Sequence, residues 1–171
     1  RIASREESRT DPSSLSTDLL SRTLSPYPSA DIRASLMPDE EIAHIKAVTI
    51  DQVRRVHREF LGANEGELVI VGDFDPEPTL QQVSAIVANW KSDQPYARIE
   101  RQPFLNVPGG KHSILTPDKA NANYLAGLTL AMNDQDPDYP ALVIGNFIFG
   151  GGSLSSRLGD RVRQKEGLSY G

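Results

Sequence analysis

Cysteine is absent from this sequence of 171 residues. Its absence excludes disulfide bonds, thiolate metal sites and a cysteine nucleophile. It does not distinguish a periplasmic from a cytoplasmic protein, because both can lack cysteine. No apolar run approaches the roughly 20 residues that cross a bilayer, so we expect no membrane span. No secretory signal opens the chain, and because it begins with Arg1 rather than Met, we expect the natural chain to extend further.

Recognisable catalytic motifs are also missing. The histidines, His44, His57 and His112, never stand four residues apart, so no H-x-x-E-H or related zinc pair exists. There is no G-x-S-x-G elbow to place a serine nucleophile. We therefore expect no metal ligands in this chain, and we interpret His44 and His57 as surface or boundary residues.

The charge balance argues against a nucleic-acid partner. The net charge is −5, and no long basic run offsets it. With 38% hydrophobic and 24% charged residues, the composition is that of a folded protein rather than a disordered one.

Periodicity predicts helices and strands in two blocks. The first block, residues 1–93, ends in a charged segment at 94–112 that contains prolines and a Gly-Gly pair, which we interpret as a linker. The second block, 113–171, stops within a pattern, so we expect it to be truncated. The predicted helices are 11–25, 38–47, 49–62, 75–90, 140–149 and a segment from Ser153 or Ser155 to Lys165, and the predicted strands are 67–74, 121–131 and one beginning at Leu168.

Two glycine-containing motifs allow both a structural and a functional interpretation. The stretch GDFDP, residues 72–76, could be a metal loop, but a strand end followed by Asp75 as a helix cap explains it better. Gly150, Gly151 and Gly152 could cradle a phosphate, but no P-loop lysine follows them. We expect these three glycines to let another backbone come close, as a substrate would.

The last nine residues, RQKEGLSYG, are the best candidate for a substrate contact. They close a basic stretch in which Arg157 and Arg161 would lie one helical turn apart. A solvated basic face is the simpler interpretation. The functional alternative is recognition of a substrate carboxylate or carbonyl by the planar guanidinium fork of arginine, helped by a tyrosine hydroxyl.

Several runs together resemble the pitrilysin/insulinase (M16-type) family of zinc metallopeptidases. They are TIDQVRRVHREFLG, DKANANYLAGL and, most specifically, S-S-R-L followed by R-x-K-x-G-L-S-Y-G, and the resemblance covers about residues 10–171. It implies an α+β fold, with parts of two LuxS/metallopeptidase-like α+β units whose helices pack on a mostly antiparallel sheet. It also implies two halves that close around a peptide substrate, one of them holding zinc.

The resemblance assigns roles to two residues of this chain. Arg163 begins the R-x-K-x-G-L motif and Tyr170 follows seven residues later, and both are expected to orient the peptide and stabilise the oxyanion opposite the zinc. The chain itself lacks the zinc ligands, so it is expected to come from the metal-free half and to be inactive alone. The full-length protein would be a zinc metalloendopeptidase.

Other origins stay open at this point. The zinc-binding part of the same half could precede Arg1, and the distal glutamate ligand would then fall near Ser4, close to Glu6 and Glu7. A metal-free partner or structural subunit of a processing-peptidase-like complex is a second possibility. An unrelated binding domain with a basic helix is a third.

Overall fold

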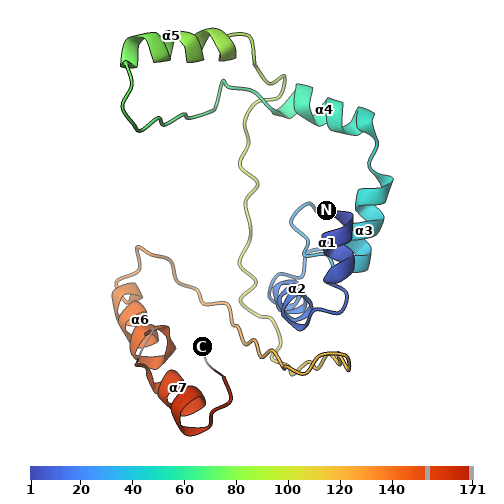
Figure 1. The fold of residues 1–171 in the computed structure, drawn as a ribbon, viewed down its shortest axis with the longest axis vertical. Coiled ribbons are helices and arrows are strands. Elements are labelled where there is room, and N and C mark those ends of the chain that lie inside the picture. The colour runs from blue at the N-terminus through green and yellow to red at the C-terminus, as the bar shows by residue number, and fades with distance from the viewer. Residues whose placement is uncertain (153–154, 170–171) are drawn as a thin grey trace. The chain divides into compact units, whose positions relative to one another are not determined.

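The computed structural model describes residues 1–152 and 155–169, which fall into two compact units, Arg1–Leu128 and Thr129–Gly171. In the described ranges no helix is both long and apolar enough to cross a membrane. Figure 1 shows the elements, which are α1 (Ile2–Glu7), α2 (Pro12–Leu24), α3 (Pro38–Ala47), α4 (Ile50–Phe60), α5 (Pro76–Val87), α6 (Tyr139–Asn146), η1 (Phe147–Gly151), α7 (Arg157–Gly159) and η2 (Asp160–Lys165).

Local capping chemistry explains where the helices of the first unit begin. The Asp11 carboxylate accepts a hydrogen bond of 2.7 Å from the Ser14 backbone N–H, and proline occupies the first position of α2, as predicted. At α4, Thr49 and Gln52 each accept from the other's backbone N–H, forming a capping box. The predicted starts of these helices are therefore confirmed.

The expected α+β fold is wrong for the described residues. No strand forms in 1–152 or 155–169, and the regular structure there is helical, with no antiparallel sheet. The predicted strands 67–74 and 121–131 have no regular secondary structure, and no described strand lies beside them to take their hydrogen bonds. Residues near Gly127 instead approach α2, since a Cβ built on Gly127 would lie 2.9 Å from Leu24 Cδ1.

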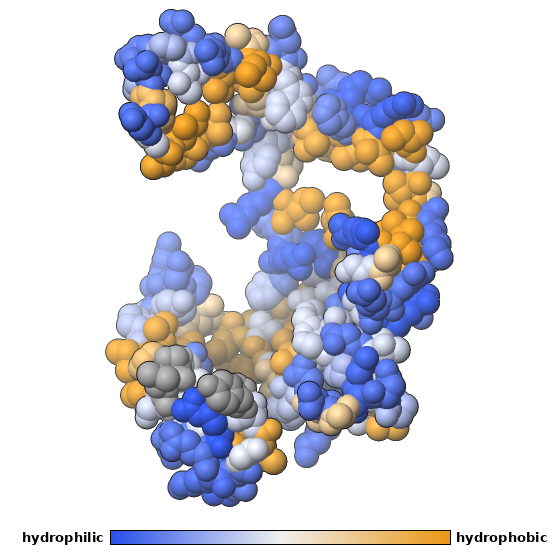
Figure 2. All heavy atoms as spheres, viewed as in Figure 1, coloured by the Kyte–Doolittle hydropathy of each residue, from blue (hydrophilic) through white to orange (hydrophobic). Residues whose placement is uncertain are grey.

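The predicted inward faces of α4 and α5 are not buried by any described residue. Ile50 at the start of α4 is 62% exposed, and Ile86 on α5 is 80% exposed. The predicted strand between them shows the same pattern, with Val71 at 91%. Figure 2 shows hydrophobic residues at the surface along both helices. The amphipathic pattern was correct, but the described chain supplies no surface against which it can pack.

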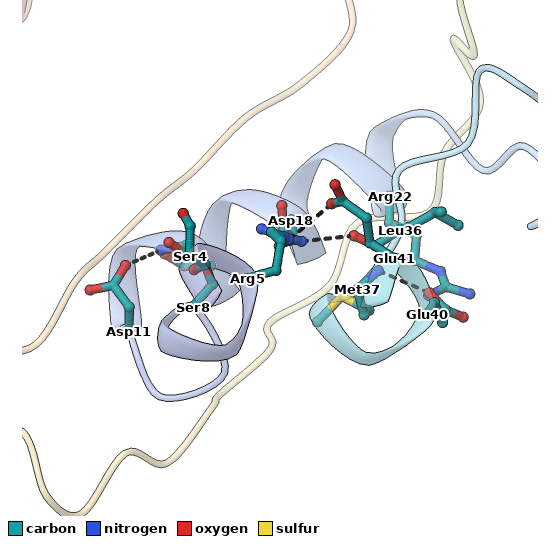
Figure 3. Close-up of polar contacts among 12 residues, drawn as sticks. Ser4, Arg5, Ser8, Asp11, Asp18, Arg22, Leu36, Met37, Glu40 and Glu41 are labelled. Carbon is teal, nitrogen blue, oxygen red and sulfur yellow. Dashed lines mark hydrogen bonds and ion pairs between the residues drawn. The ribbon is translucent and has the colours of Figure 1, made fainter. Parts of the chain in front are cut away.

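An ion-pair cluster joins α1, α2 and α3. Arg5 of α1 is only 17% exposed, and its Nη2 lies 2.8 Å from Asp18 Oδ2 of α2, while its Nε lies 2.9 Å from Glu41 Oε2 of α3. Arg22 of α2 reaches Glu40 of α3 at 2.7 Å. Figure 3 shows these side chains converging between the three helices. We call Arg5, Asp18 and Glu41 the ionic clasp.

The ends of α4 and α5 are joined by backbone contacts. The Ala63 N–H donates to the Trp90 carbonyl at 2.8 Å, and the Gln94 N–H donates to the Glu59 carbonyl at 2.9 Å. A Cβ on Gly62 would collide with the Ser92 backbone nitrogen, so only glycine allows this close approach. These contacts define the α4–α5 hairpin, in which the ring of His57 stacks on that of Trp90 with centroids 6.3 Å apart.

Candidate functional site

The basic segment that sequence analysis selected begins with a capped turn. Ser156 is buried, and its hydroxyl accepts a hydrogen bond of 3.1 Å from the Gly159 backbone N–H at the start of α7. A Cβ on Gly159 would lie 2.9 Å from the same hydroxyl oxygen, so a side chain at position 159 would crowd the cap, whereas glycine does not. Ser156 was missed as a cap, although a serine before a helix is an ordinary cap signal.

Arg163 lies on η2, a π-helical segment, and its side chain is half-buried. The wider π-helical turn joins residues five apart, as the hydrogen bond from the Glu166 N–H to the Arg161 carbonyl shows. The side chains of that same pair form an ion pair of 2.6 Å. Arg161 is 68% exposed although it is bound to Glu166, and Arg157 and Lys165 are exposed as well, as a solvated basic face would be.

After η2 the chain reverses at Gly167. Its φ of +62° is the left-handed conformation that favours glycine. The turn brings the Leu168 N–H within 3.0 Å of the Val162 carbonyl. Tyr170, the second predicted site residue, lies outside the described residues, so the expected pairing of Arg163 with Tyr170 stays a prediction.

The three glycines before α7 occupy a tight corner. Gly150 and Gly151 end η1, where a Cβ on Gly150 would lie 3.1 Å from Leu158 Cδ1. A Cβ on Gly152 would lie 2.5 Å from the Ser155 carbonyl oxygen. The backbone that comes close at Gly152 therefore belongs to the chain itself, and a substrate role for the three glycines remains a prediction.

The described residues do not fit a zinc site. Within 1–152 and 155–169, no three side chains of His, Asp or Glu gather as metal ligands would. Glu6 and Glu7 belong to α1, which has no histidine, and His57 stacks on Trp90. A zinc ion would therefore need ligands from outside the described residues.

Sequence analysis missed the ionic clasp altogether. Arg5 and Glu41 are far apart in the sequence, and their pairing depends on how α1 packs on α3. The available signal was the repetition of arginine at Arg1, Arg5 and Arg9, which places three cations on one side of a helix. Arg9 indeed reaches Asp39 of α3 at 2.6 Å.

Comparison with known proteins identifies the family to which the chain belongs. Residues 47–171 match the family described as "Peptidase M16 inactive domain". Since this match covers most of the chain, the chain belongs to the peptidase M16 family, and it represents a metal-free, non-catalytic segment of that family.

One curated relative also matches the chain. The chain is 29% identical over 131 residues, or 76% of its length, to the "Probable inactive metalloprotease YmfF" of Bacillus subtilis (strain 168). The matched part covers 30% of that relative, so the chain spans less than a third of the relative's length. No solved structure matches the chain significantly.

Proposed function

We propose that this chain supplies the substrate-contacting wall of a zinc-dependent peptidase that works with two halves. Arg163 and Tyr170 would hydrogen-bond the peptide near the scissile bond and stabilise the oxyanion, while a zinc-bearing half in the same chain or in a partner subunit supplies the nucleophile. The observation that carries the proposal is the R-x-K-x-G-L-S-Y-G motif inside the matched inactive domain.

The division of labour has a chemical basis. Hydrolysis of an amide near neutral pH requires an activated water, and zinc supplies it by lowering the pKa of the water to about 7. A guanidinium and a phenol can donate hydrogen bonds to a developing oxyanion but cannot attack a carbonyl. The half-buried Arg163, placed just before the reversal at Gly167, is suited to such a donor role.

A metal-free partner subunit is the second candidate. The curated relative carries the words "probable inactive" in its name, which supports a protein that performs no hydrolysis itself. In that case Arg163 and Tyr170 would contact a protein neighbour or a bound peptide that is not cleaved.

The first prediction concerns the chain alone. After incubation with zinc and exhaustive dialysis, we expect well below one zinc per chain and no peptide hydrolysis above the blank, because the described residues offer no ligand cluster. Elemental analysis and a fluorogenic peptide assay measure the two quantities. One tightly held zinc per chain would contradict the assignment to the metal-free half.

The second prediction concerns the complete peptidase to which we assign this chain. Tyr170→Phe removes one oxyanion donor and should lower kcat about 100-fold with little change in KM, since the donor acts mainly in the transition state. Tyr124→Phe is the matched control, because Tyr124 is 87% exposed. An unchanged kcat in Tyr170→Phe would refute the oxyanion role, and an inactive wild-type assembly would favour the partner subunit.

A further inference from the structure

The loop between α2 and α3 carries a tightly paired Asp31 and Arg33. Arg33 donates from Nε to Asp31 Oδ1 at 2.8 Å and from Nη2 to Asp31 Oδ2 at 2.7 Å, and its backbone N–H also donates to Oδ1 at 2.9 Å. Such a bidentate pair fixes the plane of the guanidinium. The same guanidinium lies 4.4 Å from the centroid of the Tyr27 ring, so the three side chains form one rigid group.

This group holds a distant stretch of extended chain. Arg33 Nη1 donates to the Glu100 carbonyl at 3.0 Å. The Gln102 N–H donates to the Tyr27 hydroxyl oxygen at 2.7 Å, and the Phe104 ring meets the Tyr27 ring edge-on with centroids 4.9 Å apart. The contacts therefore hold two backbone groups, at Glu100 and Gln102, and one side chain, that of Phe104.

We propose that Tyr27, Asp31 and Arg33 form a latch that holds residues 100–104 extended against the loop between α2 and α3. The latch fixes residues 100–104, the middle of the predicted linker 94–112, to the rest of the first unit. The proposal does not depend on the proposed peptidase function.

Amide hydrogen exchange of the whole chain, followed by NMR, tests the latch directly. Tyr27→Phe keeps the ring but removes the hydroxyl, so we expect the Gln102 amide to exchange about fivefold faster, as loss of one hydrogen bond implies. Tyr96→Phe is the matched control, because Tyr96 lies in the same linker and is 70% exposed. Equal exchange of Gln102 in wild type and Tyr27→Phe would overturn the proposal.

Trypsin provides a second readout that does not depend on the tyrosine. Arg33→Lys keeps the charge but loses the planar fork, so cleavage after Arg101 should accelerate while circular dichroism of the helices stays unchanged. Cleavage after Arg101 at the wild-type rate in Arg33→Lys would show that the stretch is not held by the latch. Preferential cleavage of wild type after Arg101, ahead of Lys111 outside the held stretch, would likewise contradict the latch.

Discussion

The pKa of the Asp31 carboxyl is set by its immediate neighbours. The hydrogen bonds from the Arg33 side chain, followed by the one from the Arg33 backbone, lower the pKa of this carboxyl from 3.8 to about 2. Two other acidic residues follow the same rule. Hydrogen bonds from Ser14 lower the pKa of Asp11, and the Met37 backbone N–H, helped by Arg22, lowers that of Glu40.

The lowered pKa of Asp31 predicts an acid-dependent loss of stability. A carboxyl whose pKa is depressed in the folded state stabilises that state above about pH 4, and the contribution disappears as the pH falls toward 2. We expect the Asp31 carboxyl carbon to titrate near pH 2 by NMR. The difference in unfolding temperature between wild type and Asp31→Asn should be full at about pH 5 and vanish near pH 2. A titration midpoint near 3.8 would contradict the bidentate pair.

At the scale of elements, the sequence predicted α2 to α6 but missed α1, and it predicted strands that do not form in the described residues. Caps such as Asp11 and Thr49 act on residues within one turn, so their effect is visible in the sequence. The start of α3 at Pro38 followed from the same local logic. A strand such as 67–74 depends on a neighbouring strand, and the described residues provide none. For the site, the sequence predicted that Arg163 lies on a helix. It did not predict the π-helical turn or the Arg161–Glu166 pair, because both depend on how that segment folds.

The ionic clasp yields a prediction at this scale. Arg5→Ala leaves Asp18 without its cation and Glu41 with Arg1 alone, in a partly buried setting, so we expect the docking of α1 to lose about 1–3 kcal/mol. Arg54→Ala is the matched control, because its pair with Asp51 is 70% and 87% exposed and should contribute less than about 0.5 kcal/mol. Urea unfolding monitored by circular dichroism compares the two. Equal losses would mean that the clasp has no special role.

At the scale of the molecule, the described chain leaves an unusual amount of apolar surface uncovered. Large hydrophobic side chains are exposed on α4, α5 and α6, and Ile42 is the one large aliphatic side chain of the described residues that is buried. Exposed apolar patches of this kind mark surfaces that bind other protein or aggregate. The helical pattern alone could not reveal this, because amphipathicity shows which face is apolar but not what covers it.

The exposed face of α4 predicts binding of a hydrophobic dye. We expect the isolated chain to enhance the fluorescence of such a dye, and Phe60→Lys to reduce the enhancement, because Phe60 is 59% exposed on this face. A lysine near the end of a helix also suits the helix dipole, so α4 itself should persist. Asp51→Asn, which changes the charge by the same amount at an 87% exposed polar position of the same helix, should leave the fluorescence unchanged. No enhancement with wild type would show that the face is covered in solution.

The stacking of His57 on Trp90 gives the α4–α5 hairpin an optical label of its own. Trp90 is the single tryptophan of the sequence, so all indole emission comes from this place. Separation of the two helix ends would move the indole away from the imidazole and change the emission without any added dye. The opening of this hairpin can therefore be timed separately from the melting of α1, α2 and α3, which circular dichroism follows.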